Sequence, residues 1–159
     1  MKDYLVRGLV NSKNCRVFAC TTTNLTNVAQ QNHNLWPCAS AALGRMMAVT
    51  LMMGAMNKNK EKMTVVINGG GPIGTMLCTT HSDGKIKGFV SNPEVHYTYN
   101  DTGKLAVGLC VGNQGTIQVT RDMGLRNLLH LVLHYRLVKL VMISLITSCY
   151  QNRYHQLLQ

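Results

Sequence analysis

The sequence predicts an α+β protein, in which packed helices cover an antiparallel β-sheet core domain. Two observations support this fold class. Between residues 63 and 120, short β-prone runs alternate with glycine-containing turns, as in antiparallel sheets. Before this region, residues 24–31 and 37–56 have the patterns of helices. The chain of 159 residues suits a single domain, which buries roughly two thirds of the surface that its unfolded chain exposes.

The first elements are expected to be a hairpin and two helices. Within residues 4–23 the apolar runs YLVRGLV and CRVFACTTT flank a turn-forming stretch at residues 11–14. The second helix begins near Pro37, which is tolerated in a first turn because the amide there needs no helical partner. Since residues 37–56 are apolar on nearly all sides, this helix should be buried or should contact another apolar surface.

Six β-prone runs follow: MTVVIN, TMLCTT, KIKGFV, VHYTY, KLAVGLCV and TIQVT. Turn signals at residues 81–84, 100–103 and 112–115 separate neighbouring runs at the spacing of hairpins. The middle of the chain therefore predicts an antiparallel meander.

The composition changes after Arg126. The last 33 residues contain no Asp or Glu, whereas the first 126 contain all six. We therefore divide the chain into a core domain at residues 1–126 and an apolar tail at 127–159, which, if it folds, is expected to pack on the sheet as a helix. A membrane span at residues 128–146 is disfavoured, because two histidines, an arginine and a lysine interrupt the stretch.

The charge balance raises the question of a nucleic-acid partner. The chain carries a net charge of +10, with 46% hydrophobic and 14% charged residues. Apart from Lys58, Lys60 and Lys62 the basic residues are scattered, and no basic run is interleaved with aromatic residues as a strand-binding groove requires. A solvated basic surface is favoured, and nucleic-acid binding remains an alternative.

The cysteines form no recognisable metal motif. They occupy positions Cys15, Cys20, Cys38, Cys78, Cys110 and Cys149. No CxC or CxxC pair occurs, so no zinc site and no resident cofactor is predicted in this chain. Asp3 and Arg7 interrupt the apolar stretch that a signal peptide needs, which favours a cytoplasmic protein whose thiols are free.

A glycine-rich segment formally matches the GxGxxG pattern of dinucleotide-binding proteins, with Glu94 about twenty residues later. Its residues are Gly69, Gly70, Gly71, Pro72 and Gly74. A dinucleotide site needs this loop to open a helix, but residues 73–80 are β-prone. We therefore interpret the segment as a structural turn, in which glycines permit positive φ and proline adds stiffness.

No catalytic motif is evident, and we expect no enzyme. His130 and His134 are spaced as in half of a zinc-protease motif, if that segment is helical, but Leu131 replaces the general-base glutamate. No Ser-His-acid or Cys-His arrangement has the local context of a known nucleophile.

Methionines are concentrated in the second helix, at Met46, Met47, Met52, Met53 and Met56. A methionine-rich helix is usually part of a core. Flexible thioethers also suit a surface that repacks against many apolar partners, which makes these five residues candidates for binding unfolded chains. The sequence leaves both interpretations open.

Several blocks of the sequence resemble a known family. The runs HNLWPCASAALGRMMAVTLMMGAMNK at residues 33–58 and TVVINGGGPIG at residues 64–74 resemble signature blocks of the redox-regulated heat-shock holdase family HslO, the thirty-three-kilodalton chaperonin. DYLVR, TTT, GFVSNP, GKL and DMGLR follow the family order between residues 3 and 126. The resemblance covers the core domain but not the tail.

The resemblance implies a cytosolic, ATP-independent chaperone that binds unfolded client proteins under heat or oxidative stress, and allows a homodimer. Family members are held inactive by a linker and a C-terminal domain that binds zinc through CxC and CxxC thiolates. This sequence contains neither pair. We therefore expect a holdase fragment without the redox switch.

The tail has a proposed origin. Back-translated and read one base earlier, it gives, with suitable codons, a sequence resembling what the family carries after its GLR. We hypothesise a one-base deletion near the codon of Asn127, which the DNA sequence across Arg126 and Asn127 would establish. An inactive, aggregation-prone gene product is then the alternative to a working holdase, because a sheet that lacks its last strands exposes unpaired edges.

Overall fold

The computed structural model describes residues 2–10, 15–57, 61–123 and 129–136. The elements are β1 (Leu5–Val10), β2 (Cys15–Cys20), α1 (Thr23–His33), α2 (Pro37–Gly54), β3 (Lys62–Asn68), β4 (Thr75–His81), β5 (Ile86–Val90), α3 (Val107–Val111), β6 (Gln114–Asp122) and β7 (Leu129–Arg136). β1 and β2 pair as an antiparallel hairpin, and the other strands form an antiparallel sheet in the order β5-β4-β3-β6-β7. The predicted α+β class is confirmed.

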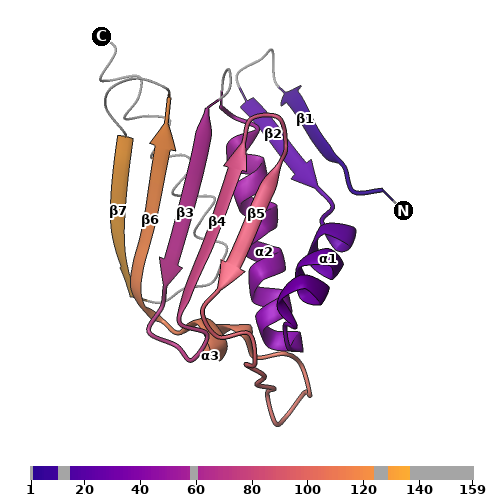
Figure 1. Cartoon of the computed structure of the whole chain (residues 1–159), viewed down its shortest axis with the longest axis vertical. Helices are drawn as coiled ribbons and strands as arrows, with labels where there is room; N and C mark the ends of the chain where they lie inside the picture. The colour runs from indigo at the N-terminus through magenta and orange to yellow at the C-terminus, as the bar shows by residue number, and fades with distance from the viewer. Residues whose placement is uncertain (1, 11–14, 58–60, 124–128, 137–159) are drawn as a thin grey trace.

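The core lies between α2 and one face of the five-stranded sheet (Figure 1). Alternate residues of β3 and β4 are buried, as expected when one face of a strand packs on a helix. On β5, a Cβ atom added at Gly88 would lie 3.1 Å from both Leu43 Cδ1 and Met47 Sδ of α2. The absence of a side chain at Gly88 therefore allows α2 to pack close to β5.

The hairpin and α1 pack beside α2, away from the far edge of the sheet (Figure 1). Asp3 joins these two elements, because its carboxylate accepts hydrogen bonds from the backbone amides of Asn24 and Leu25, at 3.2 and 2.7 Å. Thr22, the N-cap residue of α1, makes no side-chain capping bond. Asp3 therefore supplies the cap from outside the helix and places a negative charge at its positive end.

Two of the six predicted strands are not strands. Residues 95–99 of VHYTY form only an isolated bridge, between Thr98 and Leu105. The backbone at residues 93–95 pairs instead with the start of α2, since the carbonyls of Pro93 and Val95 accept hydrogen bonds from the amides of Trp36 and Ala39. In KLAVGLCV, residues 107–111 form α3. A short apolar run does not distinguish a buried strand from a buried helical turn.

The predicted meander is correct only for β3, β4 and β5. β6 returns to pair with β3 on the side opposite β4, so β3 becomes the central strand. The segment of chain that joins β5 to β6 contains α3 and an extended stretch before it. Local turn signals therefore identified strands but not their order.

The expected helix in the tail is wrong for residues 129–136, which form β7 beside β6. Leucine alternates with histidine or valine through most of this segment, which matches the two-residue period of a strand. A strand also places positions 130 and 134 roughly 13 Å apart, rather than one helical turn apart. The rest of the tail, at 127–128 and 137–159, lies outside the described residues.

Candidate functional site

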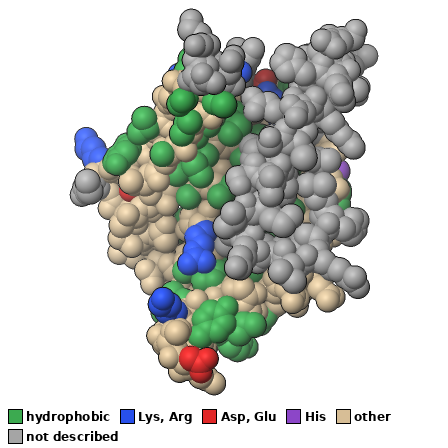
Figure 2. Space-filling model, turned by 180° about the vertical axis from the view of Figure 1, so that it is seen from behind, with side chains coloured by type: hydrophobic (Ala, Val, Ile, Leu, Met, Phe, Trp, Pro, Cys, Tyr) green, Lys and Arg blue, Asp and Glu red, His purple; other side chains and the backbone are tan. Residues whose placement is uncertain are grey.

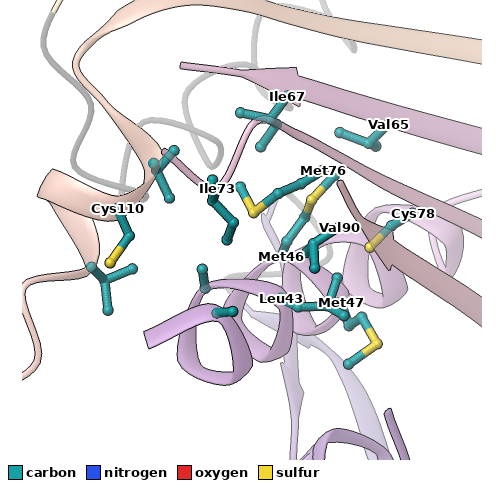
Figure 3. Close-up of a cluster of buried hydrophobic side chains, with 14 of the residues drawn as sticks. Leu43, Met46, Met47, Val65, Ile67, Ile73, Met76, Cys78, Val90 and Cys110 are labelled. Carbon is teal, nitrogen blue, oxygen red and sulfur yellow. The ribbon is translucent and has the colours of Figure 1, made fainter. Parts of the chain in front are cut away.

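The methionine-rich helix is mainly a core element. Met46, Met47 and Met53 are buried, with at most 2% of their surface exposed. Figure 3 shows Met46 and Met47 among Leu43, Ile67, Met76 and Val90 in the space between α2 and the sheet. To contact another protein, these three side chains would require α2 to move away from the sheet, and their assignment to client binding stays a prediction.

Met52 and Met56 are only partly buried. Met56 helps line a shallow groove of about 440 Å³ between the hairpin and the end of α2. The other lining residues are Arg7, Gly8, Leu9, Arg16, Phe18, Ala55 and Asn57. Figure 2, seen from behind, shows hydrophobic side chains gathered over this upper part of the molecule. Met56 therefore lies at an accessible groove of mixed polar and apolar lining.

Most of the sheet face opposite α2 is not covered by a described helix (Figure 1). At its β5 edge, the ring of Phe89 meets that of His33 at the end of α1 in an edge-on contact, with ring centroids 6.5 Å apart. A row of side chains crosses this open face at one level, because strand register places their Cα atoms opposite one another. This cross-strand row consists of Phe89, Leu77, Val66, Gln118 and Val132. With strands about 4.8 Å apart, the row spans roughly 19 Å.

The apolar members of the cross-strand row are accessible. Phe89 is 50% exposed, Leu77 36% and Val132 39%. Exposed apolar side chains are common singly, but Phe89, Leu77 and Val66 are neighbours on adjacent strands and form a continuous strip, from which Gln118 separates Val132. Such a strip offers apolar contact without a shaped pocket, so it can accept many different apolar segments.

Polar residues border the row on both sides. On one side Thr64 and Thr79 lie with their hydroxyl oxygens 3.1 Å apart, and Thr120 Oγ1 lies 2.7 Å from His130 Nδ1. On the other side Asn68 Nδ2 donates to Thr75 Oγ1 at 3.3 Å. These cross-strand pairs keep the face hydrated around its apolar centre and stabilise the register.

Sequence reasoning missed the cross-strand row. Alternate residues of β4 are buried, so period-two alternation is consistent with Leu77 on the outer face. The alignment across strands was not readable, because it depends on register. A search for outward-facing Leu, Val or Phe on every predicted strand would have found the candidates.

The glycine-rich segment is the turn between β3 and β4, and it leads into a strand rather than a helix. Gly70 and Gly74 have φ of 72° and 71°. The amides of Gly71 and Ile73 donate to the carbonyls of Val111 and Cys110 in α3, each at 3.1 Å. Two backbone donors of the turn are therefore engaged by α3, and Gly69 and Pro72 belong to the same turn.

No cluster of three or more His, Cys, Asp or Glu side chains occurs among the described residues. Glu61 is paired instead with Arg121, whose Nε donates to Glu61 Oε2 at 2.7 Å, with both side chains mostly buried. The described part of the chain therefore does not fit the zinc site that the family resemblance implies. In the same ranges, no helix has both the length and the apolar character to cross a membrane.

The expectation of free thiols is wrong for Cys38 and Cys110, which form a disulfide. Cys15, Cys20 and Cys78 are free. Burial raises the pKa of the Cys20 thiol, and the negative charge of Asp3 adds to this effect. Burial raises the pKa of Cys78 to about 12, although a hydrogen bond with Thr50 opposes the shift.

We expect iodoacetamide at pH 8 to label Cys15 and to leave Cys78 unmodified, as measured by peptide mass spectrometry. Only about one Cys78 thiol in ten thousand is ionised at that pH, and the side chain is buried. In denaturing guanidinium chloride both should react, which is the control. Equal labelling rates in the native state would contradict the prediction.

The same pKa shift makes stability depend on pH. The folded state binds the Cys78 proton more tightly than the unfolded state does, since the pKa rises from 9.0 to about 12. The free energy of unfolding should therefore fall as the pH rises above 9.

Comparison with known proteins agrees with this architecture. Residues 3–130 match the family described as Hsp33 protein, and the chain belongs to that family. It is 48% identical to the 33 kDa chaperonin of Bacillus pumilus over 125 residues, 79% of this chain and 43% of the relative. It is likewise 48% identical to the 33 kDa chaperonin of Bacillus subtilis over 124 residues, 78% of this chain and 43% of the relative.

A solved structure shares the fold. The crystal structure of the 33 kDa chaperonin, a heat shock protein 33 homolog from Thermotoga maritima, superposes with a TM-score of 0.77 and 27% sequence identity. The match covers 82% of this chain and 44% of that one. The chain thus spans less than half the length of the relatives it matches.

Proposed function

We propose that this chain is an ATP-independent chaperone that binds unfolded polypeptides, and that the cross-strand row on the open sheet face is its main contact surface. The family membership supports the chaperone class. The observation that carries the site is the alignment of Phe89, Leu77 and Val66 on the open sheet face, where α1 contacts only the Phe89 edge through His33.

The chemistry of the row suits a holdase. Unfolded chains expose apolar side chains, and burying apolar area contributes about 25 cal/mol per Å² without requiring a defined geometry. The threonine-rich borders provide hydroxyl groups for the polar backbone of a bound segment. Binding of this kind needs no reaction and no nucleotide, which agrees with the expectation that the chain is not an enzyme.

The proposal also covers the role of zinc and the cellular compartment. Client binding by these 159 residues does not depend on zinc, because the sequence has neither the CxC nor the CxxC pair. The free thiols of Cys15, Cys20 and Cys78 support a cytoplasmic setting. A zinc chelator should therefore leave client binding unchanged.

The test is suppression of light scattering from heat-denatured luciferase. We expect the Leu77→Thr/Phe89→Thr double variant to need about ten times more protein than the wild type, since losing roughly 1.4 kcal/mol of apolar contact weakens binding tenfold. Threonine keeps the β propensity of both positions. Circular dichroism at the assay temperature verifies that both proteins remain folded.

The matched control is Val28→Thr/Leu109→Thr, which removes two exposed apolar side chains from α1 and α3. This variant should suppress scattering to within about twofold of the wild type. Equal activity of the open-face variant and the wild type would refute the assigned site. A wild-type chain that only adds to the scattering would favour the aggregation-prone alternative, and steeply salt-dependent RNA or DNA binding would favour the nucleic-acid alternative.

A further inference from the structure

Cys38 and Cys110 join two distant parts of the fold. Cys38 lies in the first turn of α2, and Cys110 lies in α3, 72 residues later. Both side chains are fully buried and belong to the core, where Figure 3 shows Cys110 on the α3 side near Ile73. The enclosed segment contains most of α2 together with β3, β4 and β5.

Besides packing on α2, α3 is attached by backbone hydrogen bonds to the turn between β3 and β4. The carbonyls of Cys110 and Val111 accept hydrogen bonds from Ile73 and Gly71. The disulfide adds a covalent link from the same short helix to the start of α2. α3 therefore connects the end of the sheet with the helix that covers it.

The other described cysteines differ from this pair. Cys78 is buried as a free thiol, and Cys15 and Cys20 are free on β2. A chain with free cysteines suits a reducing compartment, where a disulfide is usually transient and responds to oxidants. A disulfide in such a compartment is reduced and re-formed by thiol exchange, so the free cysteines favour a reversible pair over a permanent cross-link.

We propose that Cys38 and Cys110 are a reversible redox pair that fixes α3 to α2 when a peroxide oxidises the chain. Both sulfurs are fully buried, so α3 must first move away from α2 to admit hydrogen peroxide. One thiolate then attacks the O–O bond of the peroxide, which gives a sulfenic acid and hydroxide. The second thiol then attacks the sulfenic sulfur, forms the S–S bond and releases water, so that two thiols and one peroxide give one disulfide and two waters. A dithiol reductant reverses the reaction by thiol exchange.

Oxidation should stabilise the domain, because the link closes a long loop in the unfolded chain. For a loop of this length, we expect the oxidised protein to melt roughly 10 °C above the reduced protein. The domain then gains resistance to heat under the oxidising conditions that form the link. This effect does not depend on client binding and can be measured without a client.

The experiment compares the full chain after hydrogen peroxide and after dithiothreitol. Non-reducing digestion with mass spectrometry should find a Cys38–Cys110 peptide only in the oxidised sample, and thermal unfolding should show the shift. The Cys38→Ala/Cys110→Ala variant should lose the difference between the two treatments. The Cys15→Ala/Cys20→Ala/Cys149→Ala variant should retain it.

Three results would overturn the inference: all cysteines remaining free after peroxide, a link that joins other cysteines, or melting temperatures of the oxidised and reduced wild type that agree within about 2 °C. If the alanine pair at positions 38 and 110 prevents folding, the wild type and the triple variant still decide between these outcomes.

Discussion

Replacing Gly112 with alanine is expected to destabilise the domain by more than about 3 kcal/mol and to leave little folded protein. Gly112 ends α3 with φ 89° and ψ 173°, a conformation that is essentially restricted to glycine. A Cβ atom there would lie 2.1 Å from the carbonyl oxygen of Gly69 and 2.5 Å from the amide nitrogen of Gly71. Both neighbours are backbone atoms of the glycine-rich turn, so neither can move without distorting the junction.

Gly84→Ala is the matched control. Gly84 has a similar φ of 85°, but nothing lies within 4 Å of the position that its Cβ would take. Its substitution should cost only about 1 to 2 kcal/mol, which is the backbone strain alone. Urea unfolding followed by circular dichroism measures both variants. Equal losses would show that the close contact between α3 and the turn contributes nothing.

Met46→Ala is expected to lower the free energy of unfolding by about 2 to 5 kcal/mol, whereas Met52→Ala should lower it by less than about 1 kcal/mol. Both residues lie on α2, and the change in side chain is the same. Met46 is fully buried against the sheet, so its truncation leaves a cavity, while Met52 is only partly buried.

Denaturant unfolding tests the two variants, and aggregation suppression by the folded Met52→Ala/Met56→Ala protein tests the binding role. Loss of suppression with unchanged stability would support client contact at the accessible end of the helix. A Met46→Ala protein as stable as the wild type would contradict the assignment of this methionine to the core.

Most secondary structure was predictable because its signals are local. The alternation in MTVVIN and TMLCTT, the proline at the start of α2 and the turn at residues 81–84 depend on near neighbours in the chain. The run KLAVGLCV was misassigned because its short apolar pattern fits a buried helical turn as well as a strand. VHYTY was misassigned because Val95 pairs with the start of α2, about sixty positions earlier, while Tyr97 and Tyr99 pair with the short segment at residues 102–106.

The candidate site was less predictable than the fold. Apolar character marked α2 as either core or binding surface, and only packing against β3, β4 and β5 placed Met46 and Met47 inside. The cross-strand row required the register of four strand pairs. Spacing along the chain gave no sign that Cys38 and Cys110 would meet.

By itself, the sequence determined the α+β class, the apolar second helix, the glycine-rich turn and the resemblance of residues 3–126 to a chaperone family. The tertiary structure decided the strand order, the partner of each cysteine and which apolar residues remain exposed. The physical reason is that helix and turn preferences act over a few residues, whereas burial and register arise from contacts between segments that are distant in the chain.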